Sequence, residues 1–176
     1  MRLTLALRAV GAGLGHINRP LCLAARNAAA GLLAAMLVLV LVQILFRYGL
    51  NAPLAWTEEA ARAAMIWLAF LVAPWAHRSG ALVAVSLFFD ALPAAPAKAL
   101  RLLIDALAFW ILAVLWIESL GFWHQGLTGR AASLDVPMAA LYTVLPVGLG
   151  LWLSVAAERL VGTAAGDPAS AADGAA

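Results

Sequence analysis

The chain has 176 residues, of which 65% are hydrophobic and 11% are charged, and its mean hydropathy is +0.97. A soluble domain of this length carries about a quarter charged residues, so this chain cannot cover itself with a wettable surface and is an integral membrane protein. The net charge of +2 comes from residues spread in ones and twos, which leaves no basic stripe and excludes nucleic acid as a partner.

Residues 1–27 predict a basic amino-terminal arm. The segment carries four arginines and no acid, and several glycines and Pro20 interrupt it. A cleaved signal peptide is not favoured, because Arg8 breaks the apolar run after a few residues and no clear small-x-small cleavage site follows. We therefore expect a cytoplasmic arm that lies on the anionic headgroups of the membrane lipid.

Four apolar segments predict an all-α integral membrane protein with four transmembrane helices. The first is nineteen residues without a charge, which is long enough to cross a hydrocarbon core of roughly 30 Å. In the fourth, Pro137 lies in the first turn and Pro146 lies inside the helix, which predicts a kink against a neighbour. We expect a membrane domain of residues 28–161, with spans at residues 28–46, 57–77, 98–123 and 136–158.

Two further segments are expected to lie outside the spans. Residues 80–89 are apolar but too short to cross the membrane before Asp90, and Pro93 and Pro96 follow. We expect an interfacial segment there, between spans two and three. The tail at residues 162–176 is rich in Ala, Gly, Ser and Asp, and we expect it to be disordered.

Span three contains two acids, Asp105 and Glu118. Their spacing of thirteen residues puts them roughly 220° out of phase, so they do not form a catalytic carboxylate pair. We expect Asp105 to pair with Arg101, four residues earlier, near one membrane surface. Glu118 is expected one or two turns from the opposite surface.

The polar connector, defined here as residues 46–62, joins the first two spans. Asn51 followed by Pro53 marks a turn, because proline fixes its own φ and pushes the preceding residue out of the helical region. Thr57 is expected to cap the second helix, with two glutamates in the first turn.

The placement of basic residues predicts the orientation of the chain. With the amino terminus inside, the cytoplasmic side holds eight basic residues and the other side holds three. We therefore expect both termini in the cytoplasm and the connector on the outer face. The eight are Arg2, Arg8, Arg19, Arg26, Arg78, Lys98, Arg101 and Arg159, and the three are Arg47, Arg62 and Arg130.

No set of residues indicates an enzyme or a cofactor site. The single cysteine, Cys22, excludes an intramolecular disulfide and a thiolate metal cluster. His77 is expected at the inner end of span two and His124 at the outer end of span three, so they cannot share one haem iron. The sequence has no hydrolase elbow, no phosphate-binding glycine loop and no HExxH pattern. It also has no convincing internal repeat of the kind carriers use, which favours a subunit that packs against something larger.

Two other functions are weighed against that interpretation. A membrane anchor of a respiratory or other redox complex is the alternative, and a haem absorbance spectrum would test it. A small proton-coupled exporter would need an acid in the middle of span one, where Gln43 near the end of the span is the nearest candidate.

The connector carries three short motifs in a fixed order: F-R-Y at 46–48, N-x-P at 51–53 and W-x-E-E-x-x-R at 56–62. This order resembles the signature of the small permease subunit of tripartite ATP-independent periplasmic (TRAP) transporters, the DctQ-like family. The resemblance covers roughly residues 28–160 and departs from the family after Gly80, where a histidine and charged residues usually follow. Further similar positions are Leu92-Pro93, Val136-Pro137-Met138, Tyr142 and Pro146-Val147-Gly148.

The resemblance implies a scaffold subunit in the bacterial inner membrane. Its partners would be a large multi-span permease, which carries substrate and sodium, and a soluble periplasmic protein that delivers an organic acid. The connector would be held by hydrogen bonds and ion pairs, either within the hairpin or to the large subunit. The candidate structural and partner-interface residues are Arg47, Asn51, Pro53, Trp56, Glu58, Glu59, Arg62, Pro137 and Pro146.

Overall fold

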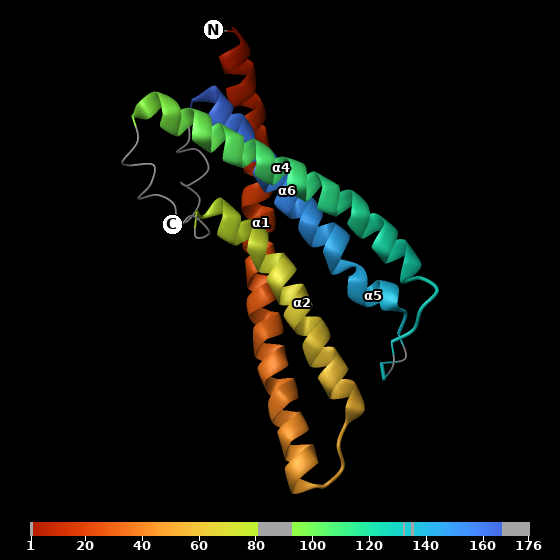
Figure 1. Cartoon of the computed structure of the whole chain (residues 1–176). Helices are drawn as coiled ribbons and strands as arrows, with labels where there is room; N and C mark the ends of the chain where they lie inside the picture. Colours follow the sequence, from red (N-terminus) through yellow and green to blue (C-terminus); the bar gives the residue numbers. More distant parts are fainter. Residues whose placement is uncertain (1, 81–92, 132, 135, 167–176) are drawn as a thin grey trace.

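The computed structural model describes residues 2–80, 93–131, 133–134 and 136–166, and these are helical almost throughout (Figure 1). Four segments are long and apolar enough to cross a membrane, so the prediction of an all-α protein with four spans is confirmed. The helix α1 ends in a π-helical turn at Leu45–Gly49. The helices are α1 (Arg2–Ile44), α2 (Ala55–Arg78), α4 (Ala94–Gln125), α5 (Met138–Tyr142) and α6 (Val144–Ala165).

Two expected segments fall largely outside the described residues. The interfacial segment expected between spans two and three lies mainly at 81–92, beyond the part of the chain that the structure describes. The helix α4 begins at Ala94, so Pro96 lies in its first turn, where a proline costs no helical hydrogen bond. The helix α6 continues to Ala165, so the first residues of the expected tail are helical, and 167–176 are not described.

The amino-terminal residues do not form a separate arm. Residues 2–27 are helical and continuous with span one, in a single helix of 43 residues. At 1.5 Å per residue this helix is about 65 Å long, roughly twice the hydrocarbon core. One face follows the alternating four-three spacing of packed helix pairs, and its small side chains allow close approach of a neighbour. These buried or half-buried residues are Gly11, Gly15, Asn18, Cys22, Ala25 and Ala29.

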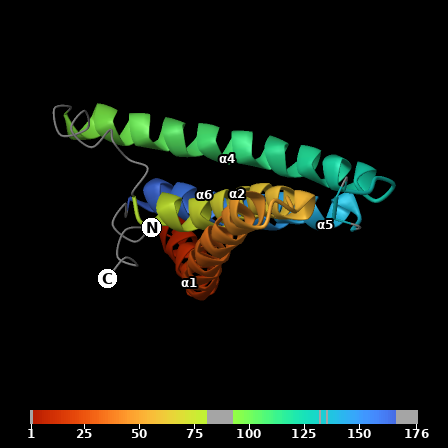
Figure 2. The ribbon, with the colours of Figure 1, turned by 90° about the horizontal axis from the view of Figure 1, so that it is seen from below.

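The helix α6 is the centre of the molecule, because α1, α2 and α4 all pack on it. Figure 2 shows the resulting layers, with α4 on one side, α2 and α6 between, and α1 on the other side. The core between α4 and α6 contains Leu112, Leu149 and Ala156, and Phe70 and Trp116 pack against it. The helix α4 therefore has α6 as its main neighbour, and none of the other described long helices covers its outer side.

A glycine sets the separation of α6 and α2. A Cβ atom at Gly148 would lie 2.9 Å from both the Cβ and the carbonyl oxygen of Phe70. Such distances are shorter than van der Waals contact, so only glycine allows this approach of the two helices.

Span four is interrupted near Pro146, as the sequence predicts. The helices α5 and α6 meet at Thr143. Pro146 has no N–H to donate to the carbonyl of Tyr142, and its ring crowds that carbonyl. Two tryptophans of α4 donate hydrogen bonds to residues at this break. The indole of Trp116 donates to the carbonyl of Pro146 at 3.1 Å, and the indole of Trp123 donates to the hydroxyl of Thr143 at 3.1 Å. The break is thus packed against α4.

Candidate functional site

The connector reverses direction at Asn51, which has a φ of 55°. This is the left-handed region, which asparagine tolerates better than most residues. The amide of Leu50 donates to the carbonyl of Leu45 at 3.3 Å, and the amide of Ala52 donates to the carbonyl of Phe46 at 3.0 Å. The predicted turn is therefore confirmed in its geometry.

The predicted cap at Thr57 is wrong. The helix α2 begins at Ala55, and its capping position is Leu54, which has no capping side chain. Thr57 lies inside the first turn, is fully buried, and donates its hydroxyl to the carbonyl of Leu54 at 2.7 Å. A threonine hydroxyl can bond to a carbonyl three or four residues earlier, so this residue is compatible with the helix interior as well as with a cap.

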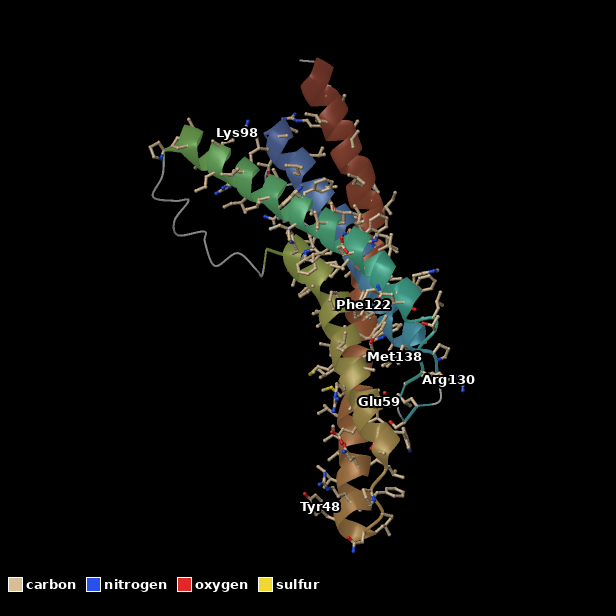
Figure 3. The ribbon with its side chains drawn as sticks, turned by 45° about the vertical axis from the view of Figure 1, so that its right-hand side comes forward. Tyr48, Glu59, Lys98, Phe122, Arg130 and Met138 are labelled. Atoms are coloured by element: carbon tan, nitrogen blue, oxygen red, sulfur yellow. The ribbon has the colours of Figure 1, made fainter. Side chains whose placement is uncertain are left out.

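The two glutamates of the connector have different partners. Glu58 pairs with Arg62 one turn later, at 3.2 Å, and both side chains are largely exposed. Glu59 instead accepts hydrogen bonds from the backbone amides of Ser133 at 2.7 Å and Leu134 at 3.1 Å, and from the Ser133 hydroxyl. Figure 3 shows Glu59 facing the α4–α5 loop, residues 126–137. Glu59 thus joins the start of α2 to a loop 74 residues later in the sequence.

The other predicted residues are spread over this end of the molecule and do not form one site. The guanidinium of Arg47 lies 5.8 Å from the ring centroid of Tyr48, and Figure 3 places Tyr48 at the tip of the α1–α2 hairpin. Pro53 is exposed on the same hairpin, and Trp56 is 43% exposed. Pro137 precedes α5 in the loop that Glu59 contacts. Pro146 lies apart from them, at the break in span four.

A buried ion pair lies at the opposite end of α2, and the sequence analysis missed it. Arg78 is 8% exposed and Glu158 is 3% exposed, and their charged groups lie 3.1 Å apart. Asn18, which is 1% exposed, donates to the Glu158 carboxylate at 2.8 Å and to the carbonyl of Ser154 at 3.1 Å. A Cβ atom at Gly15 would lie 3.1 Å from the same carboxylate. The small residues on this face of α1 therefore bring that helix close to the pair.

A second polar group continues from the first. Asp105 accepts a hydrogen bond from the hydroxyl of Thr163 at 2.6 Å, and a carboxylate oxygen lies 3.9 Å from Arg159. Arg159 also donates to the carbonyl of His77 at 2.7 Å. These contacts of Asp105 cross to another helix, and the local pair of Asp105 with Arg101 stays a prediction. The contacts of Asp105 and Arg159 together hold α4 to α6 and α6 to the end of α2.

We call these residues together the polar belt. All four long helices contribute to it, and within the described residues every buried side-chain nitrogen and oxygen has a hydrogen-bond partner. Its partners are distant in sequence, so pairing could not be deduced from local spacing. The sequence offered one signal of a buried polar site. Asn18 is the single strongly polar residue on the face of α1 whose small residues recur at alternating spacings of four and three. The belt consists of Asn18, His77, Arg78, Asp105, Ser154, Glu158, Arg159 and Thr163.

The chemistry of these groups is structural. The belt's carboxylates are bonded to arginine, amide and hydroxyl groups, so none is left open toward a cation. Within the described residues, no three His, Cys, Asp or Glu side chains lie close enough to hold a metal ion. His77 accepts a hydrogen bond from Trp152 at the belt, whereas His124 lies at the other end of α4. These two imidazoles cannot bind one haem iron.

Comparison with known proteins identifies the family. Residues 36–166 match the family described as tripartite ATP-independent periplasmic transporters, DctQ component, and this match covers more than half of the chain. The chain belongs to this family. The matched region of this TRAP small permease subunit includes the connector and every belt residue except Asn18. Membership in a transporter-component family does not favour the alternative of a redox-complex anchor.

Two relatives agree with this assignment. The subunit is 35% identical over 130 residues to a putative TRAP transporter small permease protein of Haemophilus influenzae, with 74% of this chain and 75% of the relative covered. It is 32% identical over 130 residues to an isethionate TRAP transporter permease protein, DctMQ, of Oleidesulfovibrio alaskensis. That match covers 69% of this chain and 20% of the relative, so the chain spans a fifth of the longer protein.

Proposed function

We propose that this subunit scaffolds a large multi-span permease during sodium-coupled uptake of an organic acid that a periplasmic binding protein delivers. The sodium gradient is used by the large permease, and the small subunit supplies no catalytic group and no cofactor. The complex lies in the bacterial inner membrane, and both termini of the small subunit are cytoplasmic.

The observation that carries this proposal is that polar contacts connect the helices of the bundle at both ends. At one end the polar belt joins all four long helices through buried and half-buried polar groups, among them the buried pair of Arg78 and Glu158. At the other end Glu59 joins α2 to the α4–α5 loop. Separating two buried, paired charges is costly, so the bundle resists internal movement. A rigid body of this kind suits a fixed support against which another domain moves.

The length of one relative supports the proposal that the partner is a large permease. In the Oleidesulfovibrio permease protein, the region similar to this chain is only 20% of the protein. A chain of that kind holds a small-subunit region and a longer region together, which is consistent with two permease parts that act in contact. For the separate chain, we propose that the same contact forms between two subunits.

Co-purification and transport test the proposal. The small subunit is co-expressed with an affinity-tagged large permease encoded beside it, and the complex is isolated in mild detergent. We expect the small subunit to co-purify, and we expect its deletion to abolish organic acid uptake until the gene is restored. Replacing sodium by potassium outside the cells should also abolish uptake. Absence of association, together with normal uptake after deletion, would contradict the proposal.

A further inference from the structure

The outer side of α4 presents one charged side chain among apolar ones. Five apolar residues on it are between 42% and 53% exposed. At 100° per residue they lie within about 40° of the direction of Glu118, which is also exposed. We call this surface the α4 outer face: Ile104, Leu107, Ile111, Val114, Glu118 and Phe122.

The opposite side of α4 packs against other parts of the chain. Leu112 and Ser119 are buried, and Trp116 donates to the carbonyl of Pro146 in α6. Residues 112, 116 and 119 point at least 100° away from Glu118 around the helix. In the layers of Figure 2, α4 is outermost, and its outer face therefore meets lipid or another protein.

Glu118 lies at a depth where a free carboxylate is costly. Along α4 it is thirteen residues, about 20 Å, from Asp105 in the polar belt, and seven residues, about 10 Å, from the helix end at Gln125. The belt and the α4–α5 loop are thus about 30 Å apart along α4, which is the thickness of a hydrocarbon core. Glu118 is therefore well inside that core, where acidic side chains are paired or face water.

Within the described part of the chain, no group satisfies this carboxylate. Among residues 2–80, 93–131, 133–134 and 136–166, Glu118 has neither a hydrogen bond nor an ion pair. Lysine and arginine can reach the membrane surface along their long stems, but the glutamate side chain is too short to cross 10 Å. Asp105, in contrast, has Thr163 and Arg159 as partners.

We infer that the α4 outer face is the docking surface for the large permease, and that Glu118 receives a lysine or arginine from one of its membrane helices. This inference rests on the proposed function. Charge complementarity selects the partner: a cation at that depth satisfies Glu118, and the apolar residues around it pack against the same helix. A second copy of this chain is not favoured, because a symmetric contact through the α4 outer face would bring two Glu118 carboxylates together.

Substitution of Glu118 in the two-subunit complex tests this contact. Glu118→Gln keeps the shape and removes the charge, and Glu118→Lys reverses it. We expect recovery of the small subunit with the tagged large permease to fall about tenfold or more, because one buried charge is left unpaired. The matched control is Ile117→Gln, which places an amide at nearly the same depth but about 100° away around α4. The control should retain recovery within about twofold. In the large permease, changing the paired lysine or arginine to glutamate should restore binding of the Glu118→Lys variant.

A second measurement separates docking from folding. Because Glu118 has no hydrogen bond or ion pair to a described residue, Glu118→Gln should leave the melting temperature of the isolated small subunit unchanged. If both glutamate variants are recovered with the large permease as well as the wild type is, the inference is wrong and the proposed function stands. The same holds if the variants lower the melting temperature of the isolated subunit enough to account for their lower recovery. Lost uptake with an intact complex would instead assign the carboxylate to ion movement and would also overturn docking. If the wild-type subunits fail to associate, both the proposed function and the inference are wrong.

Discussion

Two ion pairs in this chain have similar distances but different surroundings. Glu58 and Arg62 lie 3.2 Å apart with side chains that are 62% and 68% exposed. Arg78 and Glu158 lie 3.1 Å apart, and both are buried. In the exposed pair, water stabilises each charge when the pair breaks, so the pair contributes at most about 1 kcal/mol. In the buried pair, loss of one partner leaves the other without water.

Removal of Glu158 should therefore destabilise the subunit strongly. Glu158→Ala leaves the Arg78 guanidinium buried and also removes one of the two acceptors of Asn18, so we expect a loss of about 3–5 kcal/mol of unfolding free energy. Glu58→Ala is the control and should cost at most about 1 kcal/mol. The double variant Arg78→Met with Glu158→Met should recover most of the loss, because no unpaired charge remains. Thermal unfolding in detergent measures all three, and equal effects at positions 58 and 158 would contradict the structure.

At the scale of elements, α6 holds the other helices through close contacts. Its glycines allow α2 and α4 to approach: Gly148 faces Phe70, and a Cβ atom at Gly150 would lie 3.0 Å from the indole nitrogen of Trp116. The contact at Gly148 includes a backbone carbonyl, which cannot rotate away as a flexible side chain can. The separation of α2 and α6 is therefore fixed by backbone as well as by side chains.

We predict that Gly148→Ala forces α6 and α2 apart. The new Cβ atom would lie 2.9 Å from the Phe70 carbonyl oxygen, and overpacking of this kind costs about 1–3 kcal/mol. Gly121→Ala in α4 is the matched control, because apart from the adjacent backbone of its own helix a Cβ atom there has no described atom within 4 Å. It should be neutral or stabilise by up to about 1 kcal/mol through higher helix propensity. Melting temperatures in detergent should fall only for position 148.

The spans could be predicted from sequence because length and hydropathy are local properties. Asn51 at the turn and Pro146 at the helix break were also predictable, since each acts on its own backbone. The bond from Glu59 to Ser133 and the pair of Arg78 with Glu158 were not, because their partners are 74 and 80 residues apart. The continuity of residues 2–27 with span one was not predicted either, because the glycines there suggest interruptions, whereas between packed helices they allow close contact.

At the scale of the whole molecule, polar groups gather in two layers. The polar belt is one, and Glu59 with the α4–α5 loop is the other. Arg78 lies nineteen positions after Glu59 along α2, which is about 28 Å at 1.5 Å per residue. This spacing fits one bilayer core between the layers. The α1–α2 hairpin tip, where Figure 3 places Tyr48, projects beyond the α4–α5 loop, and the amino-terminal turns of α1 extend beyond the belt.

The two projecting ends of α1 therefore provide the test of orientation. In a Cys22→Ala background, single cysteines replace Tyr48 at the hairpin tip, Leu5 near the amino terminus and Leu37 between the layers, all of which are exposed side chains. In intact spheroplasts, a membrane-impermeant maleimide should label position 48, because it reaches the periplasmic face of the inner membrane. It should label position 5 only after lysis. Position 37 should stay unlabelled in both, because the reactive thiolate does not form in lipid. Labelling of position 5 but not 48 in intact spheroplasts would place both termini in the periplasm and contradict the orientation that the basic residues predict.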